Sequence, residues 1–226
     1  MNLQKNEVME IDKKLKSLKP IIKTWMNLVR KYSNRHKNED ALYWYNERAT
    51  LSTLAGAIWM SDGTALEEFA STKIKSQNKK SVRTRSGRTD LWFEWQDKQY
   101  IVEAKQISPS MHDSEKPIVD LIEESLEDAC NDAVKFSFQN GHKQYVRIGI
   151  TFLTPYLPKS YKDKDIEIKV QELKEALKNR LKIKRAYHLL VWLFLDSSHK
   201  LYDDHDELYY PGIVLAARIA QTKKKL

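Results

Sequence analysis

The fold of this chain is decided by residues 89–106, which read TDLWFEWQDKQYIVEAKQ. Its two halves, 89–95 and 99–106, are rich in β-branched and aromatic residues, and such segments favour strands. The polar residues 96–98 lie between them, where a turn would reverse the chain. We therefore expect a β-hairpin in the middle of the sequence.

Further helices and strands are expected on both sides of this hairpin. Apolar residues that recur every three or four positions predict helices, and short continuous apolar stretches predict strands. Residues 65–80 follow neither pattern clearly. The order of the elements predicts an α/β sandwich. In chain order the other expected elements are helix 41–60, helix 118–138, strand 145–153, helix 166–181, strand 187–195 and strand 213–219.

The first 40 residues are expected to form a helical extension. Val8, Ile11, Leu15 and Leu18 are spaced as on one helix face, which predicts a helix over residues 1–19. Pro20 should end that helix and begin a second one. The polar run 33–40 then predicts a linker. We expect residues 1–40 to form an extension and linker, with the helices before Ser33 dispensable for the core, and residues 41–226 to form the main domain.

Composition excludes several classes of protein. The 226 residues are 41% hydrophobic, which is enough for a core, and 39 Lys and Arg against 31 Asp and Glu give a formal charge of +8. With Cys130 alone, an intrachain disulfide and a thiolate-rich zinc site are excluded. No Gly-rich phosphate loop and no apolar run of about 20 residues is present, and no signal segment is expected. A cytoplasmic protein with a polyanionic partner is expected.

The hairpin carries the strongest chemical signal. Side chains two apart on a strand share a face, so Glu103 and Lys105 should project together. A hairpin brings the start of its first strand beside the end of its second, so Asp90 should lie near Glu103. Two converging carboxylates suit Mg²⁺. A lysine beside them can position a water or neutralise charge on a phosphate.

This arrangement resembles the PD-(D/E)XK nuclease superfamily, in which an Asp at the start of one strand precedes an acid-x-Lys triplet on the next. The matching positions are Asp90 and the triplet Glu103, Ala104 and Lys105, while Thr89 stands where a proline is usual. The resemblance covers residues 41–155. It implies a restriction-endonuclease-like fold, in which helices flank a central mixed sheet and the site lies where the hairpin splays.

The same resemblance implies a Mg²⁺-dependent endonuclease that hydrolyses DNA phosphodiester bonds, with Mn²⁺ able to substitute. Asp90, Glu103 and the carbonyl of Ala104 would hold the metal, and Lys105 would orient the attacking water. Many relatives add a Glu from the preceding helix, and Glu47 matches because it lies on an apolar stripe. Glu67 or Glu68 is the rival for that role. A restriction or mobile-element nuclease is implied, acting on double-stranded DNA as a homodimer because two strands need two sites.

Basic residues cluster beside the motif, at Lys73 and Lys75 and through residues 79–88. Cations that flank a phosphodiester-cleaving site would hold the nucleic acid by its phosphates. Gln106, directly after the lysine, could also touch a phosphate. A solvated loop explains the basic run equally well. The residues expected to bind DNA are Arg83, Arg85, Arg88, Lys79, Lys80 and Gln106.

Ordinary structural roles remain open for each of these residues. Asp90 could cap the turn into its strand, Glu103 and Lys105 could form an ion-pair face, and Glu47 could be a charge on a helix flank. The alternative function is a non-cleaving DNA-binding or assembly module with a nuclease-like core. An enzyme acting on nucleotides or RNA is a third reading. The acidic segment 202–207 could hold a metal, although an exposed connection is favoured.

Overall fold

A computed structural model describes residues 7–77, 82–114, 116–137, 145–181, 187–195 and 201–221, with backbone alone at 72, 74–77, 82–85, 137 and 181. In chain order the elements are β1 (Glu7–Ile11), η1 (Lys16–Leu18), α1 (Lys19–Arg35), α2 (Glu47–Trp59), β2 (Thr64–Gln77), β3 (Val82–Trp95), β4 (Lys98–Ile107), α3 (Ile118–Val134), β5 (Phe136–Ser137), β6 (Tyr145–Leu153), β7 (Leu157–Pro158), α4 (Asp163–Leu181), β8 (Leu189–Phe194), β9 (Tyr202–Asp203), β10 (Leu208–Tyr209) and β11 (Gly212–Ile219).

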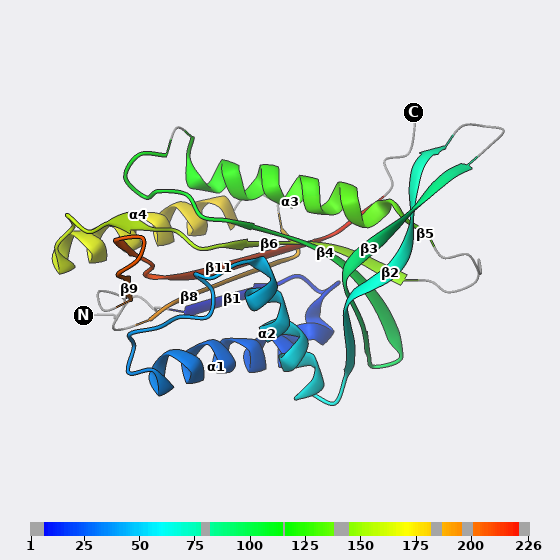
Figure 1. Ribbon diagram of the computed structural model, residues 1–226, viewed down its shortest axis with the longest axis horizontal. Helices are drawn as coiled ribbons and strands as arrows, with labels where there is room; N and C mark the ends of the chain where they lie inside the picture. Colours follow the sequence, from blue (N-terminus) through cyan, green and yellow to red (C-terminus); the bar gives the residue numbers. More distant parts are fainter. Residues whose placement is uncertain are drawn as a thin grey trace.

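One large sheet runs through the molecule, with strand order β1-β8-β11-β6-β4-β3-β2-β5. The β4–β6 pair is parallel, and the other pairs in this sheet are antiparallel. α1 and α2 cover one face, while α3 and α4 cover the other (Figure 1). The expected α/β architecture, a large mixed sheet flanked by helices, is confirmed.

The central hairpin is also confirmed, as β3 and β4. Gln96 and Asp97 form the two-residue turn with φ of 48° and 60°, which is the left-handed backbone that matches the twist of a hairpin. The two strands pair from Trp95–Lys98 to Leu91–Val102 and no further. β4 then continues to Ile107 paired with β6 alone, so the hairpin forks at Asp90.

β2 explains the segment that had no clear sequence pattern. It is a 14-residue strand that pairs with β3 along its whole length, from Thr64–Glu94 to Gln77–Val82. β5 pairs with β2 at Thr72 and Lys73, and the described strands offer no other neighbour to the outer part of this ribbon. The outer part of this ribbon projects from the sheet, where no second layer imposes alternation, so the sequence of β2 shows no clear period-two signal (Figure 1).

The helix predicted over residues 1–19 is wrong. Glu7–Ile11 form β1, which pairs antiparallel with β8 at one edge of the sheet, and η1 leads directly into α1. A spacing of three residues between Val8 and Ile11 is too short a run to separate a helix from a strand. Pairing with the fully buried β8 decides the conformation instead.

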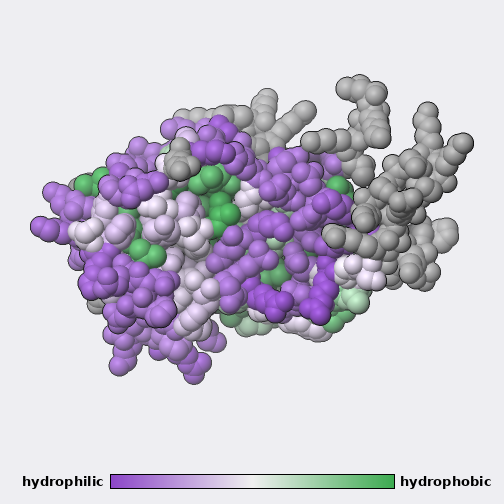
Figure 2. Space-filling view, turned by 45° about the horizontal axis from the view of Figure 1, so that its top comes forward, coloured by the Kyte–Doolittle hydropathy of each residue, from purple (hydrophilic) through white to green (hydrophobic). Residues whose placement is uncertain are grey.

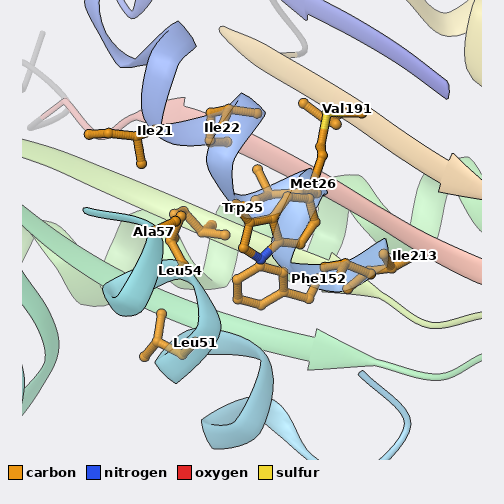
Figure 3. Packing of buried hydrophobic residues seen from close by; sticks show 14 of the residues in the cluster. Ile21, Ile22, Trp25, Met26, Leu51, Leu54, Ala57, Phe152, Val191 and Ile213 are labelled. Atoms are coloured by element: carbon orange, nitrogen blue, oxygen red, sulfur yellow. The ribbon is translucent and has the colours of Figure 1, made fainter. Parts of the chain in front are cut away.

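The N-terminal region shares one core with the rest of the chain. Trp25 and Val29 on α1 are fully buried, and the Trp25 ring lies 6.2 Å from that of Phe152 on β6 (Figure 3). In Figure 3, Trp25 and Phe152 lie in the same cluster as Leu54 of α2 and Val191 of β8. The predicted linker 33–40 therefore joins two parts of one core, and the expected helical extension is instead a strand and a core helix.

The helix predicted over residues 41–60 begins later than expected. α2 starts at Glu47, because Asn46 caps it by accepting a hydrogen bond from the Ala49 amide at 2.9 Å. The preceding segment is a turn, in which Tyr43 is buried and donates its hydroxyl to the Tyr210 carbonyl at 3.1 Å. Glu47 consequently lies in the first helical turn rather than midway along an apolar stripe.

The helix α3 packs closely against the middle of the sheet. A Cβ on Gly149 would lie 2.6 Å from the Cys130 amide nitrogen, so only glycine permits this approach of β6 and α3. The predicted helix 118–138 ends at Val134, and the remaining predicted helix and strands are confirmed as β6, α4, β8 and β11. The face seen in Figure 2 is mostly hydrophilic. Across the described ranges, every helix is too short or too polar to span a bilayer.

Candidate functional site

The fork between β3 and β4 brings Asp90 and Glu103 together. The next pair in the hairpin register after Leu91–Val102 would be Asp90 with Glu103, but the ladder has already ended. The Asp90 carboxylate replaces the missing strand partner, because its Oδ2 accepts the Ala104 amide at 2.8 Å. Asp90 thus anchors the fork and places its charge beside Glu103.

Among the Asp and Glu side chains of the described residues, Glu103 stands out by its burial and by an oxygen without a hydrogen-bond partner. It is 2% exposed, its Oε2 accepts Lys73 Nζ at 2.8 Å, and its Oε1 is buried without a hydrogen-bond partner. Burial raises the pKa of Glu103 to about 7, with the charge of Asp90 adding to the rise and Lys73 opposing it. A buried carboxylate oxygen that lacks a partner is costly, which indicates a site for a ligand.

Glu47 joins these two acids from the start of α2. Burial raises the pKa of Glu47, the charge of Asp90 raises it further, and Lys105 and the Gln106 amide oppose the rise. Burial likewise raises the pKa of Asp90, against the Ala104 amide and the charges of Lys73 and Lys105. The carboxylates of Glu47, Asp90 and Glu103 therefore share one electrostatic environment.

Lys105 lies between these acids and helix α3. Its Nζ is 3.2 Å from Asp132 Oδ2, and its side chain is 39% exposed. Burial lowers the pKa of Lys105, but the hydrogen bond and charge of Asp132 and the charges of Asp90 and Glu47 raise it above its ordinary value. The ammonium stays charged, at the rim of a cavity of about 500 Å³ that runs along the end of β4 toward Asp128.

Of the two rival acids on β2, Glu68 is the one that faces the site. Glu68 occupies the register position opposite Asp90, between the pairs Glu67–Leu91 and Phe69–Thr89, and has a left-handed φ of 50°. Its charge raises the pKa of Asp90 and Glu47. Glu67 instead accepts a hydrogen bond from Ser52 on α2 at 2.6 Å.

Two contacts at the site have no sequence signal. Lys73 reaches Glu103 from β2, 30 residues earlier in the chain, and Asp132 reaches Lys105 from α3. Neither partner has a fixed spacing from the hairpin, because each depends on how β2 and α3 pack. Lys73 appears in the sequence only as one member of a basic run.

The structure describes the expected DNA-binding residues to different extents. Arg88 is exposed and lies 3.4 Å from Glu68, while Arg83 and Arg85 lie on β3, where the backbone alone is described. Lys79 and Lys80 lie outside the described residues.

Gln106 is half-buried and lines the cavity beside Lys105, and both ends of its side-chain amide form hydrogen bonds within the protein. It accepts a hydrogen bond from Thr50 at 2.8 Å and donates one to the Tyr43 carbonyl at 3.0 Å. These two hydrogen bonds connect β4 to α2 and to the turn before α2, and they satisfy both the oxygen and the nitrogen of the amide.

The outer part of the β2–β3 ribbon is rich in Lys and Arg, whereas the inner part also carries Glu67, Glu68, Asp90 and Glu94. From residue 69 to residue 89 the sequence contains seven Lys and Arg and no Asp or Glu. Lys73 and Arg85 are opposite each other in the backbone register. A projecting two-stranded ribbon of this charge is suited to a polyanion (Figure 1).

The oxygen donors at the fork fit a hard divalent cation, although the protein alone does not supply a full set of ligands. Across the described segments, no group of three or more His, Cys, Asp or Glu side chains is arranged to hold a metal. Mg²⁺ commonly binds through one or two carboxylates and completes its shell with waters and phosphate oxygens. Asp90 and the unpartnered Glu103 Oε1 supply such a pair.

The acidic segment 202–207 is a connection rather than part of this site. Residues 204–207 form an exposed turn between β9 and β10, and Glu207 pairs with Lys159 at 2.9 Å.

Comparisons with known proteins add no family assignment. No protein-family model, no curated protein and no solved structure matches this chain.

Proposed function

We propose that this protein is a metal-dependent phosphodiester hydrolase that cleaves DNA, built on a restriction-endonuclease-like core. The observation that carries the proposal is the convergence at one fork of Asp90, Glu103 and Lys105. Within it, Glu103 is buried with an oxygen that no protein group satisfies. Perturbed acids beside a lysine at a strand fork are typical of catalytic sites.

Asp90 and Glu103 would hold Mg²⁺, with the Ala104 carbonyl and Glu47 as further oxygen donors. Bound there, the ion would supply positive charge to a phosphoryl oxygen and acidify a water. Lys105 is charged and partly exposed, so it can donate a hydrogen bond to a phosphate oxygen or to the attacking water. Lys73 keeps Oε2 of Glu103 in place from the opposite side.

Charge around the fork favours one approach for the substrate. The α3 side of Lys105 carries Asp132, Asp128 and Glu124, which repel phosphates. Residues 69–89, in the outer part of the β2–β3 ribbon, include Lys and Arg without Asp or Glu, and at the fork Lys73 pairs with Glu103 and Arg88 with Glu68. We place the nucleic-acid backbone along the ribbon, and we propose a homodimer because cleavage of both strands needs two forks.

The test is cleavage of supercoiled plasmid with Mg²⁺, with Mn²⁺ and with a chelator. Nicking that requires metal and disappears in Asp90→Asn and Glu103→Gln supports the proposal. Glu10→Gln is the matched control, because Glu10 is an exposed acid on β1 at the far edge of the sheet. Metal-dependent nicking that survives in both acid variants would place the activity elsewhere.

A second candidate is a non-cleaving DNA-binding module. It is favoured by the ion pairs themselves, because Lys73 and Asp132 already engage Glu103 and Lys105 as a structural network would. A gel shift that weakens with salt, together with intact plasmid at all metal concentrations, would select the module over the nuclease.

A further inference from the structure

A second cavity lies on the opposite side of α3 from the fork. It has a volume of about 380 Å³, and its lining includes Lys14, Glu127, His188 and Arg218. Arg218 on β11 is paired with Gly149 on β6, which is itself paired with Glu103 on β4. Since α3 packs directly over Gly149, the helix separates this cavity from the candidate site.

The hydrogen bonds of His188 determine which of its ring nitrogens carries the proton. Nδ1 accepts the Ile219 amide at 2.9 Å, so Nδ1 has no hydrogen. A neutral imidazole has one N–H, which must then be on Nε2. Burial lowers the pKa of His188, the charges of Lys14 and Arg218 lower it further, and the charge of Asp12 opposes the fall, so the ring is neutral near pH 7.

This tautomer places two donors opposite each other at a solvent-exposed position, with no acceptor from the described residues between them. Lys14 Nζ lies 3.4 Å from His188 Nε2, yet an ammonium and an N–H cannot hydrogen-bond to one another. Within the described residues, the Lys14 ammonium has no carboxylate within ion-pair distance. An acceptor from outside the chain would satisfy both groups.

Arg218 adds a third donor to the same cavity. Its guanidinium pairs with Glu127, the one acid that lines the cavity among the described residues. Lys14 and Arg218 are positive and Glu127 is negative, and the charge of Asp12 also reaches His188 beside the cavity. The volume lies within the range of small-ligand pockets, which is roughly 300–1,000 Å³.

We infer that this cavity binds the phosphate group of a small molecule or of a nucleic acid, through the Lys14 ammonium, the His188 Nε2–H and the Arg218 guanidinium. A phosphate offers several acceptor oxygens and can accept from all three donors together. The inference does not depend on nuclease activity, because none of these residues belongs to the fork.

The test is titration of the full chain with inorganic phosphate at constant ionic strength, followed by calorimetry and by nitrogen NMR of the His188 ring. We expect saturable binding and a shift of the Nε2 resonance. Lys14→Gln should weaken binding about tenfold, the loss expected for one charge-assisted hydrogen bond. Lys13→Gln, at the neighbouring exposed lysine, is the matched control and should not change the affinity.

A second variant separates binding from folding. His188→Asn keeps an acceptor for the Ile219 amide through Oδ1 but removes the Nε2–H, so it should fold and bind phosphate about tenfold more weakly. Equal affinity in wild type, Lys14→Gln and His188→Asn, or no saturable binding at all, would overturn the inference.

Competition then identifies the source of the phosphate. Displacement of bound phosphate by a short DNA duplex, lost in Lys14→Gln but retained in Lys13→Gln, would identify nucleic-acid backbone as the ligand. Displacement by a mononucleotide and not by duplex would identify a small phosphate ester.

Discussion

The buried Glu103 predicts an unusual dependence of stability on pH. Its pKa is about 7 in the folded protein against an ordinary value of 4.5, and its side chain is 3% exposed. A raised folded pKa means that the group favours folding below about pH 4.5 and that this contribution is lost as the pH rises through 7. This difference in pKa corresponds to about 3 kcal/mol of unfolding free energy, as an order of magnitude.

Glu103→Gln removes the titrating group while keeping an oxygen that can accept from Lys73. We expect the unfolding free energy of the wild type to fall by up to about 3 kcal/mol more than that of Glu103→Gln between pH 5 and pH 8. The pKa values of Asp90 and Glu47 are raised too, so the variant should retain a smaller fall in the same direction.

Urea unfolding followed by circular dichroism at four pH values measures this difference, with Glu10→Gln as the control. If Mg²⁺ binds the ionised carboxylate pair, it should stabilise the wild type at pH 8 and have little effect on Glu103→Gln. Parallel stability curves for wild type and Glu103→Gln from pH 5 to pH 8 would refute the reasoning, because Glu103 would then not titrate near neutrality.

Three other predictions concern the fork, the ribbon and the core. Lys105→Ala should retain metal binding by calorimetry but slow plasmid cleavage, and wild-type cleavage with a lowered melting temperature would instead make Lys105 structural. The double variant Arg83→Ala, Arg85→Ala should bind duplex more weakly, with a log–log salt slope reduced by about 2; an unchanged slope would remove both from the interface. Trp25→Ala should cost about 3–5 kcal/mol of unfolding free energy, whereas Trp59→Ala, at a position 55% exposed, should cost far less; similar losses would contradict the core role of α1.

Local pattern accounts for the parts of the fold that the sequence predicts correctly. The hairpin follows from a polar turn at Gln96 and Asp97 between two β-rich segments, and α3, α4 and β6 follow from periodicity within each segment. The position of Asp90 beside Glu103 also follows from local sequence, because a two-residue turn sets the register of the two strands. The candidate fork could therefore be located without tertiary information.

The partners of those residues, in contrast, depend on tertiary packing. β1 is a strand because β8 lies beside it, Glu103 is held by Lys73 from β2, and the Gln106 amide is held by hydrogen bonds with Thr50 and the Tyr43 carbonyl. Each of these pairings joins segments far apart in the sequence. The residue type determines which chemistry a side chain can perform. Its partners depend on strand order and helix packing, which cannot be read from spacing along the chain.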